Sequence, residues 1–284
     1  MPILNLNNLD QKIRQLPSLS VVVTRLLELL GREDLTMAGL MSMVGEDQAL
    51  AARILQIANS PFYGFSRHIG SLQDAGTLLG IHTLGNIITA AGVIGHFPPN
   101  NNDGFDRLSF WQHAIGVGTC ARVLARHGGL DAEIAFTAGL LHDMGKLVLA
   151  SYFATDFAAV LTWRDEHDCL LRDAEQTVLG LDHTVLGARV ARHWRLPEPV
   201  VNAIEHHHNL PEVGMPLSEL VHVADILARG LDIGHGGDDL IPVLQTRALQ
   251  RLGLNWQTIR ACLGEIESLN AAAGVLLNQG KEQR

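Results

Sequence analysis

Apolar residues recur along this chain at the three- and four-residue spacing of helices, and no stretch shows the strict alternation of a half-buried strand. Leu50, Ile54 and Ile57 line one face of a helix predicted over residues 48–58, and Asp47 is placed to cap its first turn. Comparable patterns predict further helices at residues 18–30, 36–44, 71–79, 81–93, 107–127, 131–149, 152–166, 170–179, 183–194, 198–208, 216–229, 240–252 and 256–277. The chain is therefore predicted to be all-α.

Two interruptions of the helical pattern predict the domain organisation. The run Phe-Pro-Pro-Asn-Asn-Asn-Asp-Gly at residues 97–104 consists of residue types that favour turns. A second interruption carries four glycines within residues 230–237. We therefore expect an N-terminal helical subdomain over residues 1–98, a second helical bundle over 99–232 and a C-terminal helical extension over 233–284.

Residues 75–102 contain no Asp, Glu, Lys or Arg, and this length would suffice for a bilayer span of about 20 apolar residues. Polar residues such as His82 and Asn86 interrupt the run, and its glycines lower its helix preference. We expect a helix buried inside the protein and no membrane association. The first residues lack a basic segment followed by an apolar one, so no signal peptide is expected.

Composition and charge narrow the class of protein further. Of the 284 residues 47% are hydrophobic, which excludes intrinsic disorder of the whole chain. Cys120, Cys169 and Cys262 are far apart and odd in number, which disfavours a disulfide framework and predicts a cytoplasmic protein. The 21 Lys and Arg residues against 30 Asp and Glu give a net charge of -9, which disfavours binding to long nucleic acids. A helix-turn-helix over residues 36–60 is disfavoured too, because its only basic residue is Arg53.

Several of the fourteen histidines, together with two aspartates, lie in or beside apolar helical stretches of the second half. They are His113, His142, Asp143, His183, His206, His207, His208 and Asp225. Burying imidazole and carboxylate groups without partners costs free energy, and binding to a divalent metal such as Fe, Mn, Co, Ni or Zn would offset this cost. Two ions would need a bridging ligand, which Asp143 could supply. Histidines hydrogen-bonded within an ordinary core are the alternative, and spacing alone leaves both open.

The order His113, His142-Asp143, Asp225 resembles the HD superfamily of metal-dependent phosphohydrolases. The resemblance implies a helical domain in which these residues hold a divalent metal ion. His183 and the pair His207-His208 resemble the extended set of the HD-GYP cyclic-di-GMP phosphodiesterases, where they serve a second metal. Residues 209–216 lack the Glu and the Gly-Tyr-Pro loop of those enzymes, so hydrolysis of cyclic-di-GMP is not expected.

Motifs in both halves resemble the HDOD (HD-related output) domain over roughly residues 15–230. They are Leu-Pro-Ser-Leu at 16–19, Glu-Asp-Gln-Ala-Leu-Ala-Ala-Arg-Ile-Leu-Gln-Ile-Ala-Asn-Ser at 46–60, the segment 69–80, Ala-Phe-Thr-Ala-Gly-Leu-Leu-His-Asp at 135–143, Trp-Arg-Leu-Pro at 194–197 and Ala-Ile at 203–204. This resemblance implies a bacterial signal-transduction output module with an HD-like second half. It also implies one or two bound metal ions and contacts with a signalling protein or a small nucleotide-type ligand.

A metal-dependent phosphohydrolase acting on a nucleotide or cyclic dinucleotide is the alternative function, and the sequence leaves open whether the protein is an enzyme. In that case Asp143 and Lys146 are the expected catalytic residues. Lys146 follows Asp143 by three residues, so both would lie on the same face of one continuous helix. Lys146 would then contact a substrate phosphate; a surface lysine without a catalytic role is the other interpretation.

Overall fold

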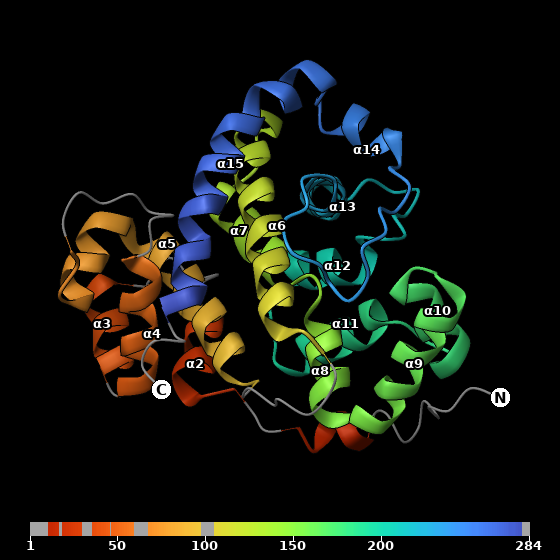
Figure 1. The fold of residues 1–284 in the computed structure, drawn as a ribbon. Coiled ribbons are helices and arrows are strands. Elements are labelled where there is room, and N and C mark those ends of the chain that lie inside the picture. Colours follow the sequence, from red (N-terminus) through yellow and green to blue (C-terminus); the bar gives the residue numbers. More distant parts are fainter. Residues whose placement is uncertain are drawn as a thin grey trace. The chain divides into compact units, whose positions relative to one another are not determined.

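The computed structural model describes residues 11–16, 19–29, 36–45, 47–59, 68–97 and 105–279. Every regular element within these ranges is a helix and none is a strand, which confirms the all-α prediction (Figure 1). The chain divides into two compact units, one formed by residues 18–98 with 267–284 and the other by residues 1–17 with 99–266. The sequence predicts boundaries after residues 98 and 232, with a C-terminal extension over residues 233–284. These boundaries stay a prediction.

The unit of residues 18–98 and 267–284 begins with a series of short helices. They are α2 (Val21–Leu29), α3 (Met37–Gly45), α4 (Gln48–Ala58) and α5 (Leu72–Gly95). Asp47 caps α4 as predicted, because its Oδ1 accepts a hydrogen bond from the backbone N–H of Leu50 at 2.9 Å. Gly80 interrupts α5 with φ 78° and ψ 166°, a backbone conformation that glycine adopts freely. The separate helices predicted on either side of Gly80 are therefore real segments of a kinked α5.

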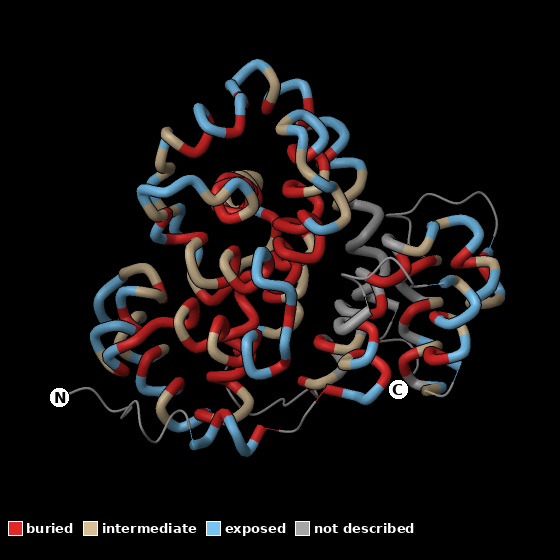
Figure 2. Tube along the Cα trace, turned by 180° about the vertical axis from the view of Figure 1, so that it is seen from behind, coloured by how far each residue is buried: buried red, intermediate tan, exposed pale blue. Residues whose placement is uncertain are grey.

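The second unit carries the remaining helices and the His/Asp residues of interest. Its helices are α6 (Arg107–Gly128), α7 (Ala132–Leu141), α8 (Met144–Tyr152), α9 (Ala154–His167), α10 (Leu171–Leu179), α11 (His183–His193), α12 (Glu198–His206), α13 (Pro216–Gly230), α14 (Thr246–Arg251) and the first part of α15 (Trp256–Gln279). Figure 2 shows the exposed positions of these helices mainly on their outward sides, with the buried positions gathered between them. The His/Asp residues lie in this buried interior.

Glycines allow two pairs of helices in this unit to approach closely. A Cβ atom placed on Gly139 of α7 would lie 2.8 Å from the Cα atom of Gly118 on α6. A Cβ atom placed on Gly145 of α8 would lie 1.9 Å from the carbonyl oxygen of His183 on α11. Any side chain at these positions would collide with backbone atoms. The two glycines therefore allow α7 to pack closely against α6 and α8 to pack closely against α11.

The single helix predicted over residues 131–149 is wrong. The structure ends α7 at Leu141 and begins α8 at Met144, with His142 and Asp143 in the turn between them. The apolar pattern continues through this turn because both helices are buried, so periodicity alone does not reveal the break. Because of this break, Asp143 lies in a turn and not on the face of a continuous helix.

The helix predicted over residues 240–252 is also too long, because only Thr246–Arg251 is helical. Residues 238–245 are irregular and are held by polar contacts instead. The Arg229 guanidinium donates to the Asp238 carboxylate at 2.8 Å and to the Leu240 carbonyl at 3.0 Å. Pro242 within this segment has no backbone N–H to offer a helix.

No single helix in the described part of the chain is both long and apolar enough to cross a bilayer. Residues 132–152 and 154–167 meet the length and composition limits only as a bent pair, with an angle of 114° between the two parts. The uncharged stretch identified from the sequence corresponds, in its described part, to α5 and the residues that follow it.

Candidate metal centre

The seven predicted metal ligands lie together in the second unit, although they come from five places in the chain. Their positions are His113 on α6, His142 and Asp143 in the turn between α7 and α8, His183 at the start of α11, His207 and His208 directly after α12, and Asp225 on α13. All seven side chains are buried, and the most exposed residue is His208 at 9%.

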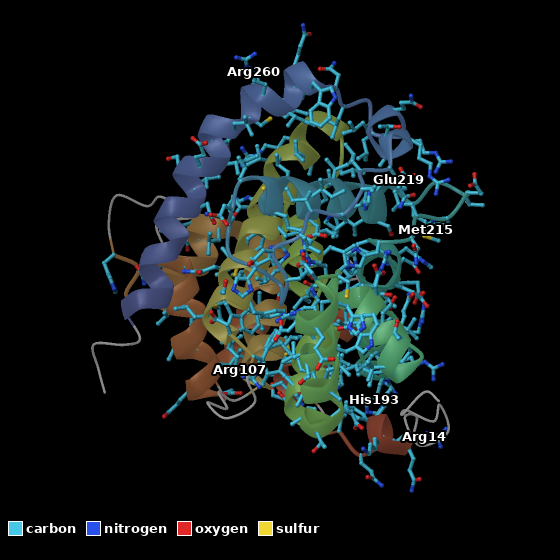
Figure 3. The ribbon with its side chains drawn as sticks, turned by 45° about the vertical axis from the view of Figure 1, so that its right-hand side comes forward. Arg14, Arg107, His193, Met215, Glu219 and Arg260 are labelled. Atoms are coloured by element: carbon cyan, nitrogen blue, oxygen red, sulfur yellow. The ribbon has the colours of Figure 1, made fainter. Side chains whose placement is uncertain are left out.

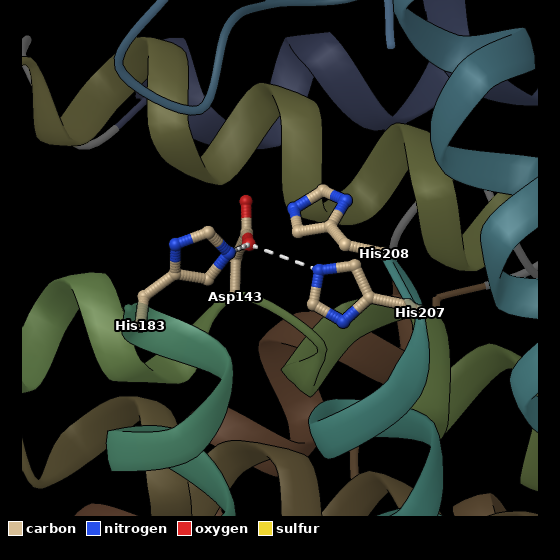
Figure 4. A group of neighbouring side chains, drawn as sticks. All are labelled: Asp143, His183, His207 and His208. Carbon is tan, nitrogen blue, oxygen red and sulfur yellow. Dashed lines mark ion pairs between the residues drawn. The ribbon is translucent and has the colours of Figure 1, made fainter. Parts of the chain in front are cut away.

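The seven residues form two neighbouring groups of ligand atoms. In the first group are Asp143, His183, His207 and His208, and in the second are His113, His142 and Asp225. Within each group the ligand atoms all lie within 4.8 Å of one another. Figure 4 shows the first group, with the Asp143 carboxylate between the rings of His183 and His207.

Asp143 faces both groups at once. Its Oδ1 lies 3.1 Å from Nε2 of His183 and 3.6 Å from Nε2 of His207. Its Oδ2 lies 3.2 Å from Nε2 of His142 and 3.9 Å from Nε2 of His113. Asp143 is the N-cap residue of α8 but makes no side-chain capping bond, so neither oxygen is turned toward the helix backbone. One carboxylate with its two oxygens directed to different groups is the geometry of a bridging ligand.

Backbone carbonyls fix the ring orientation of two of the histidines. His142 Nδ1 lies 2.7 Å from the carbonyl oxygen of Gly139, and His207 Nδ1 lies 2.9 Å from that of Ile204. A carbonyl oxygen only accepts hydrogen bonds, so each Nδ1 carries a proton and each ring directs its Nε2 to the centre. Burial also lowers the pKa of His207 to about 4, which keeps this ring neutral at pH 7.

Glu175 orients His183 from the opposite side. Its Oε2 accepts the backbone N–H of His183 at 2.8 Å and lies 2.6 Å from His183 Nδ1. Burial alone would lower the pKa of His183, but the charges of Glu175 and Asp143 raise it to about 9. A carboxylate behind a histidine, with the opposite nitrogen directed to the centre, is a common arrangement around protein-bound metals.

Sequence reasoning missed Glu175, although a signal was present. Leu171, Glu175 and Leu179 follow one another at four-residue spacing on α10, and all three are buried. A carboxylate on the apolar face of a helix needs a buried partner, and His183 is that partner. The pattern could therefore have identified Glu175 as part of the site.

Two buried cations accompany the carboxylates. Lys146 Nζ lies 2.6 Å from Asp143 Oδ2, and Arg229 Nε donates to Asp225 Oδ1 at 3.0 Å. Burial opposes ionisation of Asp143, but His142, Lys146 and His183 hold its pKa well below the usual range. Lys146 is fully buried, so the interpretation as a surface lysine is wrong. Arg229 was missed, although it follows Asp225 by four residues on α13.

The polar atoms directed into the centre have no hydrogen-bonding partner in the described structure. These buried atoms include Nε2 of His113, His142, His183 and His207 and Oδ1 of Asp143. Buried polar atoms are rarely left in this state, and convergent imidazole nitrogens with carboxylate oxygens suit first-row divalent metals. The residues present therefore fit one or two such ions.

A glycine-rich loop covers the centre. A Cβ atom on Gly236 would lie 2.7 Å from Lys146 Nζ and 2.8 Å from Asp143 Oδ2, so a side chain at this position would displace those two groups. The gap that remains beside Lys146, His183 and His208 has a volume of about 10 Å³. This is about the space of one water molecule. The sequence marks the loop by its glycines but gives no indication that it lies over the His/Asp residues.

His206 and His222 also lie near this region but are not part of the two groups. His206 is partly exposed and lies 3.9 Å from Glu205. His222 donates from Nδ1 to the carbonyl oxygen of His207 at 2.6 Å and accepts from the backbone N–H of Gln245 at 3.0 Å. His222 therefore supports the backbone at His207.

Comparison with known proteins gives relatives in both sequence and structure. The chain is 29% identical over 225 residues to an uncharacterised protein of Treponema pallidum (strain Nichols), which covers 78% of this chain and 43% of that one. It is 34% identical over 116 residues to ribonuclease Y of Aquifex aeolicus (strain VF5), covering 41% of this chain and 16% of the enzyme. The chain thus spans less than half the length of these curated relatives.

Solved structures match nearly the whole chain. An HDOD domain protein of unknown function from Geobacter sulfurreducens superposes with a TM-score of 0.80 at 25% identity, covering 95% of this chain and 97% of that one. A candidate phosphohydrolase from Shewanella amazonensis SB2B gives 0.77 at 25% identity, with coverage of 95% and 97%. A candidate signal-transduction protein from Marinobacter aquaeolei VT8 gives 0.76 at 25% identity, with coverage of 94% and 61%.

The sequence profile of the HDOD domain matches residues 16–210. The matched segment includes six of the seven predicted metal ligands and ends before Asp225 on α13. The chain belongs to the HDOD domain family.

Proposed function

We propose that the chain is a bacterial signal-transduction output module that holds one or two divalent metal ions in its second unit. The ligand residues on α6, α11, α13 and the turns after α7 and α12 would hold these ions, and bound ions would connect the five elements. The output is a contact with a signalling protein or with a small nucleotide-type ligand. A cytoplasmic location accords with the three cysteines, none of which forms a disulfide.

The observation that carries this proposal is the convergence of four imidazole Nε2 atoms and Asp143 Oδ1, all buried and without hydrogen-bonding partners. A protein core built only for stability would satisfy these atoms or replace them with apolar groups. The ligands are nitrogen and oxygen atoms without thiolate, which favours Fe, Mn, Co, Ni or Zn.

The covering loop favours a module over a hydrolase. With a gap of about 10 Å³ beside the cluster, no nucleotide can reach the ligand atoms unless residues 234–242 move. The similarity to the Marinobacter aquaeolei VT8 protein, which is described as a candidate in signal transduction, agrees with this assignment.

Metal analysis by mass spectrometry tests the proposal on protein purified without a polyhistidine tag. The wild type is expected to carry one or two transition-metal ions per chain, and the double variant His142→Ala/Asp143→Ala to carry none. His193→Ala is the matched control, because His193 is exposed on α11 and outside both groups. A wild type that stays free of metal after growth in metal-supplemented medium would refute the proposal.

The second candidate is a metal-dependent phosphohydrolase acting on a nucleotide or cyclic dinucleotide. It is favoured by Lys146, whose buried ammonium group lies 2.6 Å from Asp143 and could bind a substrate phosphate. The candidate phosphohydrolase of Shewanella amazonensis SB2B and the ribonuclease Y relatives are consistent with this chemistry. A bound metal, held in part by Asp143, would supply a water of lowered pKa, while Lys146 would hold and orient the phosphate.

Turnover measurements separate the two candidates. The holoprotein is incubated with nucleotides, cyclic dinucleotides and bis(p-nitrophenyl) phosphate in the presence of Mn²⁺. The hydrolase predicts product formation that Lys146→Met and His142→Ala/Asp143→Ala abolish, whereas the module predicts no turnover with full metal content. Turnover that depends on Lys146 would therefore replace the module with the enzyme.

A further inference from the structure

A second cavity lies in the same unit, outside the two groups of ligand atoms. It has a volume of about 450 Å³ and is bounded by α13, the irregular segment 240–244 and the first turns of α15. Its walls are almost entirely apolar and include Ile226, Leu227, Ile241 and Ile259. Small-molecule sites typically have roughly 300–1,000 Å³ and such linings, so this cavity has the size and character of a ligand site.

The cavity uses a different face of α13 from the metal centre. Asp225 is buried against His113, whereas the next two residues, Ile226 and Leu227, line the cavity. Every residue of its lining lies beyond residue 210, where the match to the HDOD profile ends. The cavity therefore belongs to a part of the chain that the proposed metal function does not use.

Large apolar side chains at the cavity are open to solvent. Trp256 is 65% exposed and Ile241 is 56% exposed, although both line the cavity. Exposed apolar surface around a concavity commonly marks a binding site, because a ligand that covers it removes that surface from water. The ligand therefore needs an apolar body.

Arg260 is the only charged residue in the lining of this cavity (Figure 3 shows its position on α15). Other arginines of this region, Arg229, Arg247 and Arg251, each form an ion pair with an acidic side chain. Arg260 has no such partner among the described residues, so its guanidinium is available to an anionic group. The ligand therefore needs a negative charge beside its apolar body.

We propose that this cavity binds a small amphipathic anion, with an aliphatic or aromatic body between α13 and α15 and a carboxylate or phosphate group at Arg260. A partner peptide is the competing occupant. The concave shape and the single cation favour the small molecule, because a peptide would need acceptors for its backbone that these apolar walls do not provide.

Titration with octanoate and with 1-heptanol tests the proposal on the full chain. These probes share a heptyl body and differ in the charge of the group that it carries. Calorimetry or Trp fluorescence is expected to show saturable binding of both, with octanoate about tenfold tighter because of the charge-assisted contact to Arg260. In Arg260→Gln the two probes are expected to bind equally.

A cavity-filling variant locates the site. Gly230 lines the cavity at the end of α13, and a Cβ atom placed there meets no atom within 4 Å. Gly230→Leu is therefore expected to occupy the cavity without strain and to abolish binding of both probes. Gly264→Leu is the matched control, because Gly264 on α15 is equally open but outside the lining.

The outcomes are distinct from those for the metal centre, since Gly230→Leu is expected to retain the wild-type metal content. Binding that is lost in Gly230→Leu, kept in Gly264→Leu and made charge-independent in Arg260→Gln supports the proposal. No binding of octanoate at millimolar concentration overturns it, as does equal weakening by both glycine variants. Wild-type binding of the two probes with equal affinity also overturns it, because Arg260 would then play no part.

Discussion

Oε2 of Glu175 accepts two hydrogen bonds from His183. The backbone N–H of His183 donates one at 2.8 Å, and Nδ1 of its ring donates the other at 2.6 Å. This pair fixes both the start of α11 and the direction of the imidazole ring. Because Nδ1 is engaged, Nε2 is the nitrogen presented to Asp143. A residue that touches no metal therefore determines whether His183 can bind one.

Glu175→Gln is expected to weaken the metal site formed by Asp143, His183, His207 and His208. Glutamine keeps the shape but has no charge and only one acceptor oxygen, so the His183 ring loses part of its orientation. Changes of this kind cost about 10–100-fold in metal affinity. Competition with a chromophoric chelator measures the loss. Glu212→Gln, at a side chain that is 90% exposed, is the control and should match the wild type.

The close approach of α8 and α11 is the basis of a second prediction. A Cβ atom on Gly145 would lie 1.9 Å from the His183 carbonyl oxygen, and neither backbone segment can yield without moving His183. Gly145→Ala should therefore destabilise the protein by about 3 kcal/mol, the upper range for overpacking, and lower its metal content. Denaturant unfolding measures the first effect.

Gly264→Ala provides the contrasting case on an exposed helix position. Nothing lies within 4 Å of a Cβ atom there, so alanine is expected to stabilise the protein by about 0.5–1 kcal/mol through its higher helix preference. Equal effects of the two substitutions would contradict the role assigned to the Gly145 contact.

The sequence predicts most of this fold because apolar spacing and caps are local signals. Asp47, for example, caps the helix that its position indicates. The turn at His142 and Asp143 escapes prediction because both flanking helices are buried and neither residue of the turn is Gly or Pro. The ligand residues are recognisable by type and order, but Glu175 and Gly236 become part of the site only through contacts between distant segments.

The three thiols give a prediction that depends on pH. Burial raises the pKa of Cys120 to about 12. Burial also raises the pKa of Cys169, but this side chain is only partly buried and is therefore accessible to a reagent. The thiolate is the reactive form, so a raised pKa reduces the reactive fraction at every pH below it. Iodoacetamide at pH 8 is therefore expected to modify Cys169 in the native protein while Cys120 stays unmodified. Peptide mass spectrometry checks this, and modification of Cys120 at the same rate would contradict its burial.

Asp143 and Asp225 differ in how many ligand groups they serve, which gives the sharpest test of the metal centre. Asp143 faces His183 through Oδ1 and His142 through Oδ2, whereas Asp225 belongs only to the group of His113 and His142. An amide is a poorer metal ligand than a carboxylate and cannot bridge two cations as effectively.

Asp143→Asn is therefore expected to lose all bound metal, and Asp225→Asn to keep the ion held with His183 and His207 if the wild type binds two. Metal analysis on protein whose helical content is verified by circular dichroism gives the stoichiometries. A wild type with two ions, and the same residual metal content in both variants, would show that Asp143 does not bridge the two groups. The bridging geometry predicts the unequal result because, among the described residues, only the Asp143 carboxylate has one oxygen within 4 Å of histidines in each group.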